Sequence, residues 1–221
     1  AGIVDEKVEI SGSDAETYQS VKILDTDSIS YNNLGLLAYT VDYDQSMSTT
    51  TDRDVVLQIY DFETGEMTHR VMVTCDQAAD SGVKFVRAED SDQQIADTYL
   101  TWISDGNIVA TDISNIIRSE KGLLQDEKSG VYYINKSRDS GYIPASVMVQ
   151  ADVNEETGEL ENAVTSFDVH STDGYVYVSW TQSASTLKKG VEENSEEALK
   201  TENQLIENQI YMARYHMAEG M

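Results

Sequence analysis

The chain has 221 residues, 40 of them acidic and 15 basic, so its formal net charge is −25. This charge excludes nucleic-acid binding through a basic face and disfavours attraction to anionic membranes. The single cysteine excludes a disulfide framework or a cysteine-based zinc site within the chain. No segment has the roughly 20 apolar residues of a membrane-spanning helix, so we expect no membrane insertion.

The first third of the chain predicts an antiparallel β-meander. Residues 36–41 are apolar and aromatic, and residues 55–60 are rich in β-branched side chains, which favour strands. The turn after them, Glu63-Thr64-Gly65-Glu66, contains a glycine that can adopt a positive φ. Residues 70–74 then read as the returning strand.

Two further meanders follow. Residues 98–103 and 108–113 flank Asp105-Gly106, and Asp-Gly between two apolar runs is the strongest short signal for a hairpin. Residues 166–170 and 175–181 form the next pair, with 210–215 as the third strand of that unit. Because each unit places an aromatic residue at the same point of a strand, we interpret them as three degenerate copies of one meander; the aromatic residues are Tyr39, Trp102 and Trp180.

Residues 187–207 differ from the rest of the chain. They are rich in Glu and Lys, and Asn194 followed by Glu197 fits a capping box. We expect a short acidic helical insertion, with a single helix continuing to Met217 as the alternative.

These elements divide the chain into four parts. Residues 1–20 are expected to be an N-terminal strand or linker, in which 3–10 could supply the missing outer strand of the last unit. The three meanders are assigned to 21–80, 81–145 and 146–221, and the last contains the insertion 187–207.

Four segments carry a resemblance to a known architecture. Residues 37–44, 51–61, 177–181 and 208–215 resemble blades of β-propellers in large secreted or cell-wall-attached proteins of Gram-positive gut bacteria. The resemblance implies an all-β, propeller-like fold, an extracellular or cell-surface location, and further blades or domains in the same protein. Propellers close with about four to eight blades, so three meanders imply a partial ring or a fourth blade within 131–149. A β-sandwich is the alternative fold.

Acidic residues suggest one metal site. Asp42, Asp44, Asp52 and Asp54 flank a single loop, and Ca²⁺ binds several oxygen ligands from flexible loops. The prediction is a calcium site at this loop, and the alternative is a solvated acidic loop.

Aromatic residues near strand ends are candidates for contact with a partner, because they offer a large contact area at low entropic cost. For the tryptophans, their equivalent positions favour packing between the units over contact with a partner. Cys75 follows a β-run and is expected to be a buried, inert thiol. The contact candidates are Tyr43, Tyr132, Tyr175, Trp102 and Trp180.

The sequence contains no nucleophile elbow, no phosphate-binding loop and no paired metal-binding histidines, so we predict no catalytic residue and no cofactor other than calcium. The expected function is that of a non-catalytic extracellular module that recognises a protein or carbohydrate partner through its loops. Two alternatives stay open: a carbohydrate-active hydrolase that uses a pair of carboxylates, and a structural spacer in a larger surface protein.

Overall fold

The computed structural model describes about three fifths of the chain, in eleven segments. The predicted N-terminal strand or linker 1–20 lies outside the described residues, and so does the predicted helical insertion, except that its last two positions belong to a strand. The described residues are 22–31, 33–42, 53–76, 78–87, 98–118, 123–128, 130–134, 145–156, 160–172, 174–185 and 206–216.

The chain is all-β, as the sequence predicts, and its sheets are built almost entirely from antiparallel pairs. The parallel exception among the named strands is the short pair β4–β9. The described residues also contain one short helix, α1. The elements are β1 (Lys22–Tyr31), β2 (Leu34–Asp42), β3 (Arg53–Asp61), β4 (Glu66–Met72), β5 (Ser81–Arg87), β6 (Thr98–Ser104), β7 (Asn107–Asp112), α1 (Ser114–Arg118), β8 (Leu123–Gln125), β9 (Tyr132–Ile134), β10 (Ser146–Val149), β11 (Asp152–Val153), β12 (Leu160–Glu161), β13 (Val164–Thr172), β14 (Tyr175–Ser185) and β15 (Ile206–His216).

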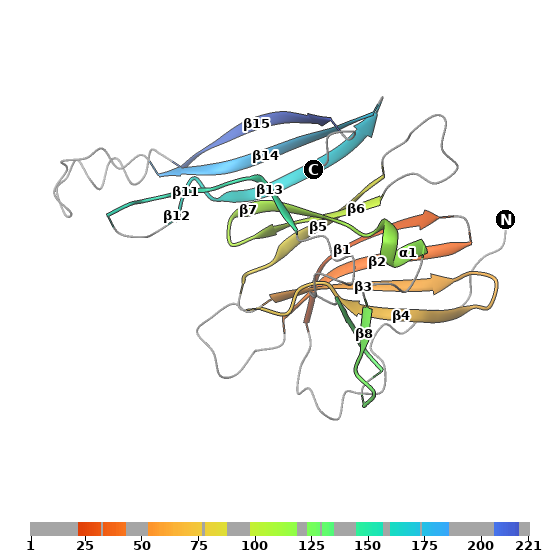
Figure 1. Cartoon of the computed structure of the whole chain (residues 1–221). Coiled ribbons are helices and arrows are strands. Elements are labelled where there is room, and N and C mark those ends of the chain that lie inside the picture. The colour runs from red at the N-terminus through yellow and green to blue at the C-terminus, as the bar shows by residue number, and fades with distance from the viewer. Residues whose placement is uncertain are drawn as a thin grey trace.

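The strands form three main sheets, with the middle sheet between the other two (Figure 1). After β5–β7 the chain returns to the first sheet with β8 and β9, and then to the middle sheet with β10. The first sheet has the strand order β1-β2-β3-β4-β9-β8, the middle sheet β10-β7-β6-β5 and the third sheet β13-β14-β15; β11 and β12 form a separate hairpin. The aromatic residues of the three meanders lie at equivalent places: in β2 of the unit β1–β3, in β6 of β5–β7 and in β14 of β13–β15. Each meander supplies the main part of one sheet, and the sheets pack against their neighbours.

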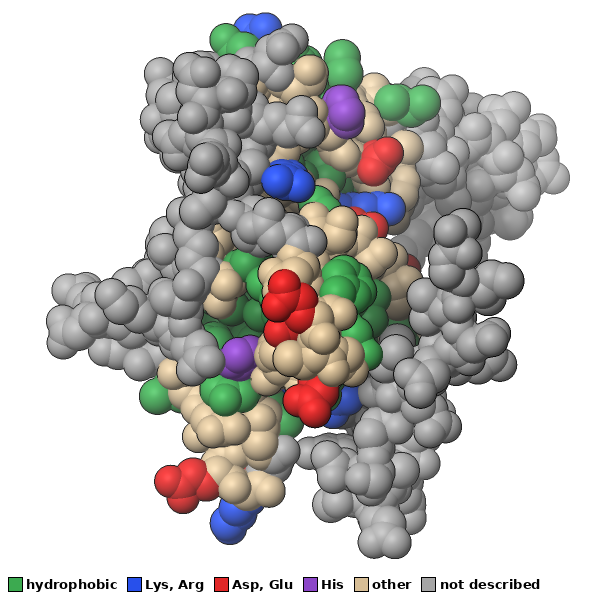
Figure 2. All heavy atoms as spheres, turned by 90° about the vertical axis from the view of Figure 1, so that its right-hand side faces the viewer, with side chains coloured by type: hydrophobic (Ala, Val, Ile, Leu, Met, Phe, Trp, Pro, Cys, Tyr) green, Lys and Arg blue, Asp and Glu red, His purple; other side chains and the backbone are tan. Residues whose placement is uncertain are grey.

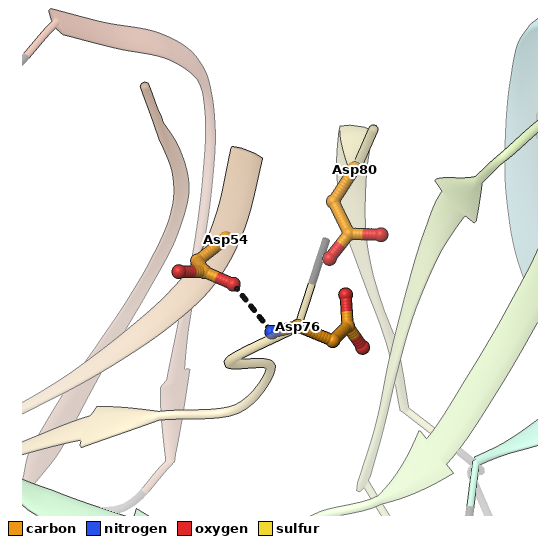
Figure 3. Close-up of side chains that lie close together, drawn as sticks. All are labelled: Asp54, Asp76 and Asp80. Atoms are coloured by element: carbon orange, nitrogen blue, oxygen red, sulfur yellow. Dashed lines mark hydrogen bonds between the residues drawn. The ribbon is translucent and has the colours of Figure 1, made fainter. Parts of the chain in front are cut away.

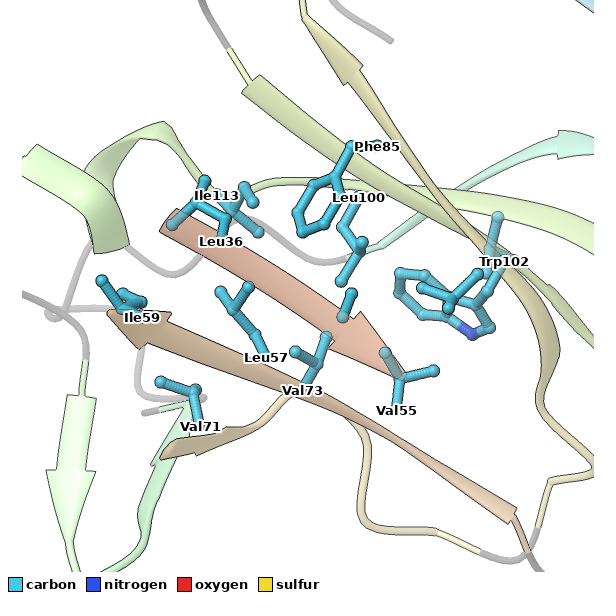
Figure 4. Packing of buried hydrophobic residues seen from close by; sticks show 13 residues of the cluster. Leu36, Val55, Leu57, Ile59, Val71, Val73, Phe85, Leu100, Trp102 and Ile113 are labelled. Atoms are coloured by element: carbon cyan, nitrogen blue, oxygen red, sulfur yellow. The ribbon is translucent and has the colours of Figure 1, made fainter. Parts of the chain in front are cut away.

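The middle sheet is buried on both faces. One cluster of buried side chains packs the middle sheet against the first sheet, and the side chains from the middle sheet include Phe85, Leu100 and Trp102 (Figure 4). A second cluster packs its opposite face, including Tyr99 and Ile103, against the third sheet. All residues of β6 from Thr98 to Ile103 are consequently buried, because alternate side chains of one strand enter two different cores.

Carboxylates of the first sheet cap the edge of the middle sheet. The backbone amide of Gly82 donates to Asp25 (3.1 Å) and that of Phe85 donates to Asp27 (2.8 Å). Both aspartates lie on β1, where a register shift between Ile23 and Thr26 interrupts the pairing with β2. Buried backbone groups need partners, so these side chains replace the neighbouring strand that β5 lacks.

The turns follow the sequence prediction closely. Asp105 and Gly106 join β6 to β7 with φ values of 45° and 76°, which are the positive values of a type I′ hairpin turn. A Cβ atom at residue 106 would lie 2.8 Å from the Cβ of Ala163, so space as well as backbone conformation requires glycine there. Gly65 adopts a φ of 73° in the turn before β4, as expected.

Several boundaries differ from the sequence analysis. The strands β1 and β5 were not expected; β1 is mostly polar, and the sequence of β5 begins with Ser-Gly and contains a lysine. Residues 146–149 pair with β7 and so belong to the middle sheet and not to the third unit. The proposed fourth blade in 131–149 is wrong for the described residues, since β9 joins the first sheet and β10 the middle one. Residues 206–216 form a strand, which excludes the alternative of a helix running through them.

We expect Leu100→Ala to destabilise the fold strongly, because the Leu100 side chain is 0 % exposed in the core between the first and middle sheets. Truncating a buried leucine leaves a cavity and typically costs about 2–5 kcal/mol. Urea denaturation of the two proteins measures the loss. The matched control is Leu124→Ala, since Leu124 is 54 % exposed on β8; an equal effect of both changes would contradict the packing described.

Candidate functional site

Two parts of the molecule carry polar or aromatic side chains that could serve a function. One is a cluster of three carboxylates beside the first sheet, and the other is the outward face of the third sheet. Hydrogen bonds beside β3 build the first, and the alternation of side chains along β14 and β15 builds the second.

The carboxylate cluster consists of Asp54, Asp76 and Asp80 (Figure 3). One oxygen from each lies within 4.8 Å of the others. Asp54 lies on β3, whereas the other two belong to the segment that leaves β4 and leads to β5. Backbone hydrogen bonds hold this segment beside β3: the Arg53 amide donates to the Ala78 carbonyl (3.1 Å), and the Asp80 amide donates to the Arg53 carbonyl (3.3 Å).

Asp80 is the centre of the hydrogen bonds in this cluster. Its carboxylate accepts from the indole nitrogen of Trp102 (3.1 Å) and from the hydroxyl of Thr74 (2.7 Å). The Thr74 hydroxyl in turn accepts from the Val55 amide (2.8 Å). Asp80 thereby joins strands of the first and middle sheets through buried polar contacts.

Burial raises the pKa of Asp80 from 3.8 to about 6, and the nearby Asp76 carboxylate adds to the rise. Hydrogen bonds from Thr74, Ser104 and Trp102 favour the charged form and oppose the shift. Asp80 is fully buried and Asp54 nearly so, while Asp76 is exposed. A polysaccharide cannot reach between two buried carboxylates, so the cluster lacks the open geometry that a glycoside hydrolase needs.

The predicted calcium ligands are only partly within the described residues. Asp44 and Asp52 lie outside them. Asp42 pairs with Arg53 across β2 and β3, whereas Asp54 pairs with Val41, so the side chains of Asp42 and Asp54 leave opposite faces of the sheet. Calcium binding at this loop stays a prediction; the structure groups Asp54 with Asp76 and Asp80 instead.

The aromatic candidates are found in different environments. Trp102 was a candidate for contact with a partner, which is wrong: it is buried between two sheets and bonded to Asp80. Tyr43 lies outside the described residues. Tyr132 is half-buried on β9, with its ring centroid 4.7 Å from that of His69. The thiol of Cys75 is exposed, contrary to the expectation that it is buried.

The third sheet presents the remaining candidates, and its two faces differ. Val176 and Val178 of β14 are fully buried against the middle sheet. Trp180 lies on the same face, half-buried, and stacks on Tyr211 with ring centroids 5.6 Å apart. At the other end of β15, the Tyr215 hydroxyl donates to the Met148 carbonyl (2.6 Å). Trp180, Tyr211 and Tyr215 therefore attach β15 to the core.

The alternate residues of this sheet form its outer face, by which we mean Tyr175, Tyr177, Ile210, Met212 and Arg214. Ile210 is 81 % exposed and Met212 is 74 % exposed, the highest values among the large hydrophobic side chains of the described chain. The guanidinium carbon of Arg214 lies 4.6 Å from the centroid of the Tyr175 ring, within the range of a cation–π contact. The sequence analysis identified Tyr175, but it missed Ile210 and Met212, whose exposure depends on the position of β15 at the end of its sheet.

The acidic charge of the described residues is not concentrated in one patch on the side of the molecule in Figure 2. Asp and Glu side chains lie there in small groups among hydrophobic and basic ones. No helix among the described residues has the length and apolar character needed to cross a membrane.

Comparison with known proteins adds no relative. The chain matches no protein-family model, no curated protein and no solved structure.

We expect Asp80→Asn to change how stability depends on pH. The folded state binds a proton at Asp80 below about pH 6, whereas the unfolded state does so only near 3.8, so protonation of Asp80 stabilises the fold as the pH falls from about 7 to about 4. The stability of the wild type relative to the variant should therefore be greater at about pH 5 than at about pH 7.5, by about 1 kcal/mol.

Urea denaturation at the two pH values measures this difference, and about pH 5 avoids the isoelectric point near 4.2. The variant Glu63→Gln, at an exposed turn, controls for the removal of one carboxylate from an acidic protein. If the free energies of unfolding of wild type and Asp80→Asn differ by the same amount at both pH values, the raised pKa of Asp80 is contradicted.

Proposed function

We propose that this chain is a non-catalytic, extracellular binding module that recognises a protein partner through the outer face of its third sheet. The observation that carries the proposal is the exposure of Ile210 and Met212 beside Tyr175, Tyr177 and Arg214. Contiguous exposed apolar side chains on a soluble protein are typical of interaction sites.

The composition of the outer face supports a protein partner more than a glycan. Tyrosine, methionine and arginine are enriched at protein–protein interfaces, and they anchor such interfaces in buried contacts. The side chain of Ile210 offers a sugar hydroxyl no hydrogen-bonding atom, and that of Met212 offers only a weak thioether acceptor. Recognition through a sheet face replaces the earlier expectation of recognition through loops.

The alternatives have less support. A hydrolase needs accessible carboxylates, and the grouped carboxylates Asp54 and Asp80 are buried. A structural spacer would not explain two strongly exposed hydrophobic side chains on one strand. We also propose that the three sheets are part of a propeller-like arrangement within a larger surface protein; three antiparallel sheets packed face to face support this.

We expect Tyr175→Ala with Tyr177→Ala to abolish binding of a protein partner that the wild-type chain captures from its source. The two rings lie side by side on β14 with centroids 6.5 Å apart, and both contribute to the outer face. Quantitative pull-down, followed by titration calorimetry with the purified partner, measures the loss; removing a central aromatic contact typically costs about 2 kcal/mol or more.

The control is Leu124→Ala, which removes an exposed hydrophobic side chain from β8 of the first sheet and should leave binding unchanged. Equal binding by the folded double variant and the wild type would overturn the proposal. A screen of folded protein that captures no partner, or turnover of chromogenic glycosides, would also count against it.

A further inference from the structure

Among the described residues, no strand pairs with the outer side of β15, and its length and regular pairing distinguish it from the other sheet edges. The edge of β5 is capped by Asp25 and Asp27. The edge strands β8 and β10 have only three and four residues. The longer edge strands β1 and β13 have ten and nine residues, and a register shift interrupts the pairing of each with its neighbour. By contrast, β15 has eleven residues and is the last strand of its sheet (Figure 1).

The sequence of β15 lacks the features that usually prevent edge-to-edge pairing. It contains no proline, glycine or lysine, and it pairs with β14 without any shift of register over its whole length. Natural proteins commonly protect long edges with such residues or with bulges. A straight edge with two highly exposed hydrophobic side chains, Ile210 and Met212, is suited to pairing with another strand.

We propose that β15 pairs with β15 of a second copy of this chain, antiparallel and about a two-fold axis at Tyr211. A residue that lies a given number of positions before Tyr211 is then opposite the residue that lies the same number of positions after Tyr211 in the other copy. Ile210 of each copy lies directly opposite Met212 of the other. The dimer therefore contains two identical contacts between the two most exposed hydrophobic side chains.

This register satisfies the symmetry of the sheet. A two-fold axis perpendicular to the sheet keeps each side chain on its own face, so residues that pair must be an even number of positions apart. Ile210 and Met212 meet this condition and share the outer face. The paired edges join two three-stranded sheets into one continuous sheet with a doubled outer face.

Charge also favours a second copy at this edge. The chain carries −25 overall, which opposes self-association through most of its surface. The sequence of β15 has one glutamate and one arginine, so its formal charge is zero. The dimer therefore brings together a neutral strip of an acidic molecule. It does not depend on the proposed protein partner, because the contact is made by backbone and side chains of this chain alone.

Sedimentation velocity of the purified wild-type chain tests the proposal. We expect a species of twice the chain mass of 24.6 kDa, and Met212→Lys should shift it to the monomer, because each lysine would replace an apolar contact with Ile210 of the other copy. The side chain at 212 is exposed in the single chain, so the change should leave the fold intact, as circular dichroism can check.

The matched control is Met67→Lys, which adds the same charge at another exposed methionine, 49 % exposed on β4, and should leave the dimer unchanged. A wild-type chain that sediments as a monomer would overturn the proposal. So would a dimer that Met212→Lys leaves intact, or one that Met67→Lys dissociates equally.

Cysteine cross-linking tests the register. On a Cys75→Ser background, a mixture of Ile210→Cys and Met212→Cys chains should form a disulfide-linked dimer under mild oxidation, since directly opposite Cα atoms lie about 4.5–5.5 Å apart. Either variant alone should form much less disulfide-linked dimer, because its two cysteines would lie diagonally across the paired strands and not directly opposite each other. Equal cross-linking by a single variant and by the mixture, on a non-reducing gel, would contradict pairing about Tyr211.

Discussion

The burial of the middle sheet on both faces is the constraint on which the rest of the structure depends. The strand β6 has no face that contacts water, so its alternate side chains must fill two separate cores. Leu100 and Trp102 enter one core, and Tyr99 and Ile103 enter the other. The first and third sheets cover the middle sheet from opposite sides. The first sheet also carries a smaller buried cluster on its other face, made by Tyr39, Val41, Val56 and Met72.

This arrangement explains why an acidic protein places carboxylates inside. When two sheets enclose a third, polar groups at its edge and in its turns lose water and must find partners within the protein. Asp25 and Asp27 accept backbone hydrogen bonds of β5, and Asp80 accepts from Trp102 and Thr74. These aspartates connect neighbouring sheets, and the raised pKa of Asp80 follows from its burial.

The packing also separates the inner part of the molecule from the part for which we propose a function. Backbone and carboxylate hydrogen bonds complete the packed edges, whereas the third sheet is attached through only one face. Its opposite face, with Ile210 and Met212, has no structural task in the described fold. A surface that the core does not need is available for recognition of a partner, and the adjacent edge of β15 is available for pairing.

The sequence by itself determined the local elements: Asp105-Gly106 specifies its hairpin through backbone conformation, and the β-branched run 55–60 specifies a strand. It also determined the all-β class and the three meanders, because short-range patterns encode them. Only the tertiary structure decided that Trp102 is buried, that Asp76 and Asp80 join Asp54, and that Ile210 and Met212 are exposed. These facts depend on which sheet covers which face, and residues far apart in the chain set that packing. The polar strand β1 was missed for the same reason, since its aspartates serve a strand that begins about fifty residues later.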